Sequence, residues 1–153
     1  MGAKLKAVDK MIAKMISKKL EPSAIAEWKK PLNEAKVALI TTGGVHLHDQ
    51  VAFDGEKGDP TYRVLPADMD FEDWTITHGH YDQTEAEKDL DVILPIKRLE
   101  ELIADGHVGS MTEVHYSFMG YIPDIGPLVD KYAKDLADDL VDRDVDIAIL
   151  SPT

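Results

Sequence analysis

Apolar residues recur along the chain with spacings that are typical of strands in some segments and of helices in others. Val37 to Ile40 is an uninterrupted apolar run that predicts a strand, and TYRVLP (61–66) predicts a second one. A short strand is expected where DWTITHGHYD (73–82) begins, before that segment becomes a polar loop. The last eight residues, DIAILSPT (146–153), contain an apolar run that predicts a fully buried strand of a parallel sheet.

Two segments in the second half of the chain have helical periodicity. Pro95 suits the first turn of a helix and Gly106 suits its stop. The residues expected to point inward from this helix are Ile96, Leu99, Leu102 and Ile103. A second helix is predicted from about Asp124 to Arg143, with these residues buried: Ile125, Leu128, Val129, Tyr132, Leu136 and Leu140. Strands that alternate with helices predict an α/β fold, in three layers, with a mostly parallel sheet and flanking helices.

The amino-terminal segment differs from the rest of the chain in charge. Residues 3–20 have apolar positions at three- and four-residue steps and predict a basic amphipathic helix. A second short helix is predicted from Ala24 to Lys30, ended by Pro31. Residues 1–20 carry a balance of +5 within a chain whose net charge is −12. We therefore divide the chain into a helical leader, 1–34, and an α/β domain, 35–153. The leader is expected to pack on its own acidic domain or, as the alternative, on a partner.

Composition narrows the class of protein further. The 153 residues, 44% of them apolar, suit one globular domain. The acidic balance argues against general nucleic-acid binding. No apolar stretch is long enough to span a bilayer and no secretory signal is visible, so we expect a cytoplasmic protein. The absence of cysteine excludes disulfides and a cysteine nucleophile from these residues.

Polar residues that could bind a ligand or take part in catalysis follow the apolar segments. Thr41-Thr42-Gly43-Gly44 follows the first strand, which is typical of a ligand site, although its glycine spacing is not that of a phosphate-binding loop. Five histidines lie in segments expected to be loops: His46, His48, His78, His80 and His115. Two His-x-His pairs, His46 with His48 and His78 with His80, could hold a divalent metal together with Asp49 and Asp82, as in a metal-dependent hydrolase or lyase.

The alternative is a polar pocket for a small anionic or zwitterionic substrate. Arg63 could hold a carboxylate with two hydrogen bonds, while His46, His78 and Asp82 could transfer protons near neutral pH. The aromatic residues that could line such a pocket are Tyr62, Trp74, Tyr81, Tyr116 and Phe118, although ordinary core packing is the more common role for Tyr62, Trp74 and Phe118. The same pocket could also serve a non-catalytic module that binds small molecules.

Four segments in order resemble one known family. They are ALITTGGVHLHDQVAFD, GDPTYRVLP, THGHYDQTEAEKDLDVILPIKRLEELIADGHVG and EVHYSFMGYI, within residues 35–153. The succession resembles the selenoprotein B subunit family of the glycine, sarcosine, betaine and D-proline reductases, with the D-proline reductase branch the most similar. The resemblance implies a subunit that works with a pyruvoyl-bearing partner subunit and a thiol reductant system to cleave a C–N bond of a small amino acid.

In that family a strand matching DIAILSPT is followed at once by selenocysteine. The resemblance therefore implies that the nucleophile, selenocysteine or cysteine, would follow Thr153, and that the 153-residue chain is inactive alone. A selenol ionises readily, so it would be a nucleophile at neutral pH without a strong base. By the same resemblance, the substrate-binding or proton-transfer candidates are His46, His48, Arg63, His78, Tyr81, Asp82 and His115. An exposed last strand would also favour association with a second copy through its edge.

Overall fold

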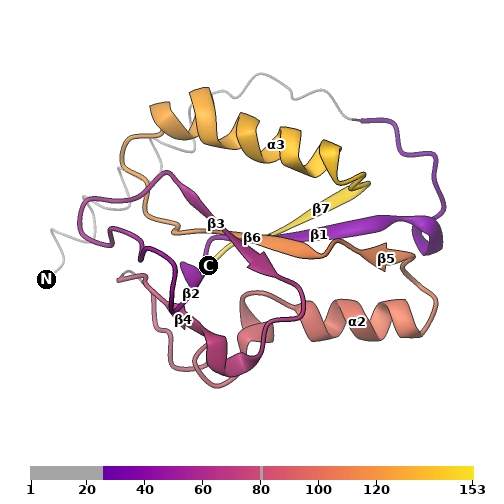
Figure 1. The fold of residues 1–153 in the computed structure, drawn as a ribbon, viewed down its shortest axis with the longest axis horizontal. Coiled ribbons are helices and arrows are strands. Elements are labelled where there is room, and N and C mark those ends of the chain that lie inside the picture. Colours follow the sequence, from indigo (N-terminus) through magenta and orange to yellow (C-terminus); the bar gives the residue numbers. More distant parts are fainter. Residues whose placement is uncertain (1–25, 80) are drawn as a thin grey trace, which may run out of the picture.

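The computed structural model describes residues 26–79 and 81–153, and its main sheet is mostly parallel (Figure 1). Strand β1 (Lys36–Thr41) lies in its middle. On one side β1 pairs in parallel with β7 (Ile147–Ser151), and on the other with β5 (Ser110–Met111) and β6 (Val114–Phe118), which follow each other along β1. Strand β3 (Tyr62–Pro66) is antiparallel to β6 at the opposite edge.

Helices cover both faces of this sheet, giving three layers (Figure 1). Alternate residues of β1 point to opposite faces, so Val37 and Leu39 enter the core beneath α2 (Ile96–Ala104). Ala38 and Ile40 enter a second core beneath α3 (Ala133–Asp142). A π-helical turn, Leu128–Tyr132, leads directly into α3. The predicted three-layer α/β class is thereby confirmed.

A second, two-stranded sheet lies beside the α2 layer. It pairs β2 (Val45–Leu47) with β4 (Trp74–Ile76) in antiparallel register. Short 3-10 turns at Leu32–Glu34, Phe71–Asp73 and Leu90–Val92 connect the larger elements. Val45 and Trp74 are buried in the same core as Leu39, so the small sheet closes that core from one end.

Several predicted elements are confirmed. The strands expected at 37–40 and 61–66 are β1 and β3, and the helix expected after Pro95 is α2. Gly106 ends α2 with φ of 75°, a left-handed conformation that a glycine adopts without steric cost.

Other expectations about helices hold only in part, although the helix predicted from about Asp124 to Arg143 is present as Leu128–Asp142. Residues 26–30 of the predicted 24–30 helix are not helical. Within the predicted 124–143 helix, Leu136 is buried and Leu128 and Leu140 pack against it, but Ile125 and Val129 are exposed. Leu102 of α2 is exposed as well. For Val129 and Leu102, the apolar stripe of the helix is wider than the part of the sheet that the helix covers. Ile125 lies before the helical residues.

The final strand forms as predicted but is not fully buried. β7 is an edge strand that pairs with β1 alone in the described residues, and Leu150 is 69% exposed. An apolar run fits a central strand and an uncovered edge strand equally well, because it carries no information about neighbouring layers. Association through that edge stays a prediction.

The predicted basic helix at residues 3–20 lies outside the described residues, so the structure does not test it. Within 26–79 and 81–153, no helix is long and apolar enough to cross a membrane.

Candidate functional site

The carboxyl ends of β1, β6 and β7 meet at one edge of the sheet. The N–H of Thr42 donates to the carbonyl of Ser151 at 3.2 Å, and the N–H of Gly120 donates to the carbonyl of Thr42 at 2.8 Å. The N–H of Thr153 donates to the Thr42 hydroxyl oxygen at 3.0 Å. Three segments far apart in sequence are thus fixed together where open α/β sheets bind ligands. We call this the carboxyl edge.

The loop that begins at Thr77 packs against the carboxyl edge. The N–H of Thr77 donates to the Gly44 carbonyl at 2.9 Å, and the Tyr81 hydroxyl donates to the Gly43 carbonyl at 3.0 Å. Gly44 has φ of 70°, and a Cβ on it would lie 2.4 Å from the Thr77 carbonyl oxygen. The loop can approach this closely because residue 44 has no side chain.

His78 and Tyr81 of this loop lie beside the edge. Their rings meet edge to face with centroids 4.7 Å apart, and His78 is buried. A Cβ on Gly120 would lie 3.1 Å from the Nε2 atom of His78, which places this imidazole directly beside the edge. Burial raises the pKa of Tyr81 to about 12, so its hydroxyl is protonated at neutral pH and can hold the bond to Gly43.

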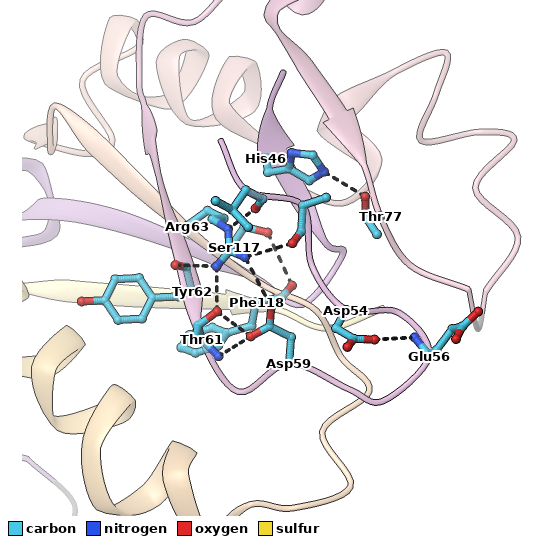
Figure 2. Close-up of polar contacts among 12 residues, drawn as sticks. His46, Asp54, Glu56, Asp59, Thr61, Tyr62, Arg63, Thr77, Ser117 and Phe118 are labelled. Carbon is cyan, nitrogen blue, oxygen red and sulfur yellow. Dashed lines mark hydrogen bonds and ion pairs between the residues drawn. The ribbon is translucent and has the colours of Figure 1, made fainter. Parts of the chain in front are cut away.

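His46 was expected in a loop, but it is buried within strand β2. Its Nδ1 lies 2.9 Å from the Leu47 carbonyl. Its Nε2 lies 2.8 Å from the Thr77 hydroxyl (Figure 2). A carbonyl accepts only, so Nδ1 carries a proton and donates to Leu47, while the Thr77 hydroxyl can either donate to Nε2 or accept from it. His46 therefore fixes the start of the loop that carries His78.

Arg63 contributes all of its donors to the chain itself (Figure 2). Its guanidinium makes five hydrogen bonds, with the carbonyls of Val51, Ala52 and Tyr62, the Thr61 hydroxyl and the Asp59 carboxylate. It also lies 4.2 Å from the centroid of the Phe53 ring. A guanidinium has five N–H donors, so this geometry leaves none for a substrate carboxylate. Arg63 holds the 51–61 loop against β3.

His115 was also expected in a loop and instead lies within β6, fully buried. Its Nδ1 accepts the N–H of Leu39 at 3.2 Å. Burial lowers its pKa to about 4, so the ring is neutral at physiological pH. His115 belongs to the interior of the sheet and not to the carboxyl edge.

His48 and Asp82 are both exposed. Hydrogen bonds from the Thr84 hydroxyl and N–H lower the pKa of Asp82, so it is a carboxylate at neutral pH and a poor proton donor there. His48 lies apart from His78, on a groove of about 400 Å³ that Asp49 and Asp73 also line. Of the seven predicted site residues, the structure brings together His46, His78 and Tyr81.

The aromatic residues proposed for a pocket serve mainly as core. Tyr62, Tyr116 and Phe118 pack in the core beneath α3, and Trp74 packs in the core beneath α2. Their usual structural role is thus the one that the fold uses. Trp74 also borders a cavity of about 190 Å³ at the start of α2, together with Asp91 and Lys97.

The metal alternative requires the two His-x-His pairs to point their imidazoles at one place. The described residues do not show such a group. Among residues 26–79 and 81–153, no three acidic or histidine side chains are grouped closely enough to hold a metal ion. His46 is turned into β2 while His48 is exposed in the following turn. His80 lies outside the described residues.

Sequence reasoning missed two residues that organise the edge. Thr42 receives the end of the chain from β7, and Thr77 links His46 to the loop. The Thr-Thr-Gly-Gly turn had marked the location of Thr42, but nothing in the local pattern marks Thr77. Its role depends on the pairing of β2 with β4.

Comparison with known proteins identifies the family of this chain. The family model of the glycine/sarcosine/betaine reductase selenoprotein B (GRDB) matches residues 10–153. The chain belongs to the selenoprotein B family. The match begins at residue 10, so the likeness extends into the basic leader, which the quoted segments had left outside it.

Curated relatives are similar to this protein across most of its chain. The D-proline reductase subunit gamma of Acetoanaerobium sticklandii is 30% identical over 80% of this chain and 50% of its own length. The glycine reductase complex component B subunit gamma of Symbiobacterium thermophilum is 31% identical over 81% of this chain and 30% of its own length. The sarcosine reductase complex component B subunit beta of Peptoclostridium acidaminophilum is 24% identical over 97% of this chain and 37% of its own length.

The chain therefore spans half or less of the length of these relatives. No solved structure matched the chain.

Proposed function

We propose that the chain is the amino-terminal α/β part of a subunit of an amino-acid reductase complex. The reaction is reductive cleavage of the C–N bond of a small amino acid such as D-proline, glycine, sarcosine or betaine. Membership of the selenoprotein B family carries this proposal, since relatives bear the names of D-proline, glycine and sarcosine reductases. The convergence of three strand ends at the carboxyl edge supports it.

The reactive residue of the whole protein is proposed to follow Thr153, as selenocysteine or cysteine. β7 delivers the chain to Thr42, and the Thr153 N–H is bonded to the hydroxyl oxygen of that residue. A residue at the next position would emerge at the carboxyl edge. A selenolate or thiolate there supplies the nucleophile for the reductive step. The 153 residues alone are then expected to lack reductase activity.

His78 is the residue of this chain that we propose for proton transfer. It lies beside Gly120 at the carboxyl edge, and an imidazole can donate a proton to a leaving amine near neutral pH. His46 and Tyr81 act as positioning residues, because they fix the two ends of the His78 loop through Thr77 and Gly43.

The substrate carboxylate needs a cation other than Arg63. All five guanidinium donors of Arg63 are engaged within the chain. We propose that the rest of the complex provides this group, together with the pyruvoyl residue that activates the substrate and the thiol system that supplies electrons.

The complex purified from its natural source tests this function. We expect it to release the C–N cleavage product from at least one of D-proline, glycine, sarcosine and betaine when a dithiol is the reductant. His78→Gln in the whole protein should lower kcat with little change in KM, roughly a hundredfold if the imidazole transfers the proton. A matched control is His48→Gln, an exposed histidine away from the edge. If none of the four substrates is reduced with the partner subunit present, the proposed function is contradicted.

A further inference from the structure

An apolar surface formed by α3 and the edge strand β7 is left uncovered by the described residues. Residues of α3 and its preceding turn recur on this face at four-residue steps, and all are exposed: Val129, Ala133, Ala137 and Val141. Val141 is 72% exposed and Val129 56%. Such spacing places the four side chains in one stripe along the helix.

The contacts of α3 show which way this stripe points. Leu136 packs into the core above Ala38 and Ile40. On one flank of Leu136, Asp139 accepts the Tyr116 hydroxyl of β6 at 2.7 Å. The helical spacing puts Ala137 and Val141 on the opposite flank, away from β6 and therefore toward β7.

β7 adds apolar residues to the same face. Ala38 pairs with Ala148 and Ile40 pairs with Leu150, and residues paired in register point to the same side of a sheet. Ala148 and Leu150 therefore lie on the α3 side, and both are exposed. We call the stripe with these two residues the α3–β7 face. Figure 1 shows α3 lying along the side of the sheet at which β7 is the edge strand.

Acidic residues border the α3–β7 face. Asp130, Asp138 and Asp142 each follow a residue of the stripe by one position, and all three are exposed. An occupant should accordingly combine an apolar stripe with basic residues, since opposite charges at the rim of an apolar contact favour one partner over others.

Residues 3–20 have that combination. Their apolar residues at helical spacing are Leu5, Val8, Met11, Ile12, Met15, Ile16 and Leu20, and residues 1–20 contain six lysines. An 18-residue helix would be about 27 Å long, against about 22 Å for Leu128–Asp142.

The described chain also leads from this segment to the right place. Lys30 Nζ lies 2.5 Å from the carboxylate of Asp146. Asp146 comes directly before β7 and shortly after α3 in the chain. Residues 21–29 could span up to about 30 Å when extended, so the leader can reach the whole of the α3–β7 face from this anchor. We propose that residues 3–20 of the same chain pack as a helix on the α3–β7 face, which goes beyond the proposed reductase function.

Amide hydrogen exchange in the full chain tests this docking. Met11→Asp with Met15→Asp puts two charges on the apolar side of the segment, and we expect exchange at 133–142 and 147–151 to become roughly tenfold faster, with 96–104 in α2 unchanged. Ala13→Asp with Ser17→Asp adds the same charge to the polar side and should leave all three regions nearly unchanged.

Two results would overturn the proposal. One is exchange in α3 and β7 that is the same in the parent and in both variants. The other is protection that disappears on dilution together with dissociation of a dimer in light scattering, because the occupant is then a second copy.

The cysteine-free chain offers a further check. Met11→Cys should cross-link within one chain to Val129→Cys or Val141→Cys, and not to Arg98→Cys on α2; the absence of both α3 cross-links would count against docking.

Discussion

The Nδ1 atom of His115 accepts the backbone N–H of Leu39 at 3.2 Å, in a break between two strands. Val37 pairs with Met111 and Ile40 pairs with Tyr116, so two extra residues lie on the β5–β6 side of β1. The ladder is interrupted there, and the imidazole replaces the missing backbone acceptor. Its Nε2 has no hydrogen-bond partner among residues 26–79 and 81–153. His115 is therefore held neutral in the sheet.

This geometry predicts a loss of stability in weak acid. An unfolded histidine takes up a proton near pH 6.5, whereas burial lowers the folded pKa of His115 to about 4. The unfolded state thus binds more protons between these values, and stability falls as the pH falls through that window. We expect His115 to contribute a loss of about 2 kcal/mol between pH 7 and pH 5.

Urea unfolding at both pH values measures this contribution. His115→Asn keeps an acceptor for Leu39 without a titrating ring, so its stability should fall less than that of the parent. His48→Asn, at an exposed position, should fall as the parent does. Equal pH dependence in the parent and in His115→Asn would show that His115 is not held neutral.

Arg63→Lys should destabilise the protein even though it keeps the charge. A lysine cannot replace five donors arranged in a planar fork, so the bonds to Val51, Ala52 and Asp59 cannot all be kept. We expect a loss of about 2–3 kcal/mol in urea unfolding and faster proteolytic cleavage in the 51–61 loop. If Arg63 instead served to bind substrate, Arg63→Lys would leave the folding free energy unchanged and weaken binding alone.

Gly44→Ala should displace the loop that carries His78. Residue 44 is in the left-handed region, and a Cβ there would meet the Thr77 carbonyl oxygen at 2.4 Å. We expect a loss of stability of about 1–3 kcal/mol, with new NMR shifts for Thr77 and Tyr81. Gly55→Ala is the matched control, because its φ is not positive and the nearest atom to its Cβ would be 4.0 Å away. Similar losses in both variants would mean that the close approach at Gly44 has no special role.

Local pattern predicted the elements that depend on local chemistry. The apolar run before Thr41, the TYRVLP strand and the helix between Pro95 and Gly106 follow from side-chain alternation and from the backbone limits of proline and glycine. The three-layer class follows from the order of these elements.

What the pattern could not predict depends on contacts between distant segments. The solvent exposure of β7 depends on what lies beyond it in the sheet, and its apolar run is silent on that point. His46 and His115 were expected in loops, although apolar or aromatic residues flank both in the sequence. Strand pairing draws both histidines into the interior. Arg63 could be assigned to the 51–61 loop only after its guanidinium was seen to lie over the Phe53 ring of that loop.

The central claim concerns the residue that follows Thr153 in the whole protein. Mass spectrometry of protein purified from its natural source, digested before Asp146, reads this position directly. We predict that the peptide continues past Thr153 with selenocysteine, seen as the isotope pattern of selenium, or with cysteine. A peptide that ends at Thr153 with a free carboxylate, or that continues with neither residue, would contradict the account.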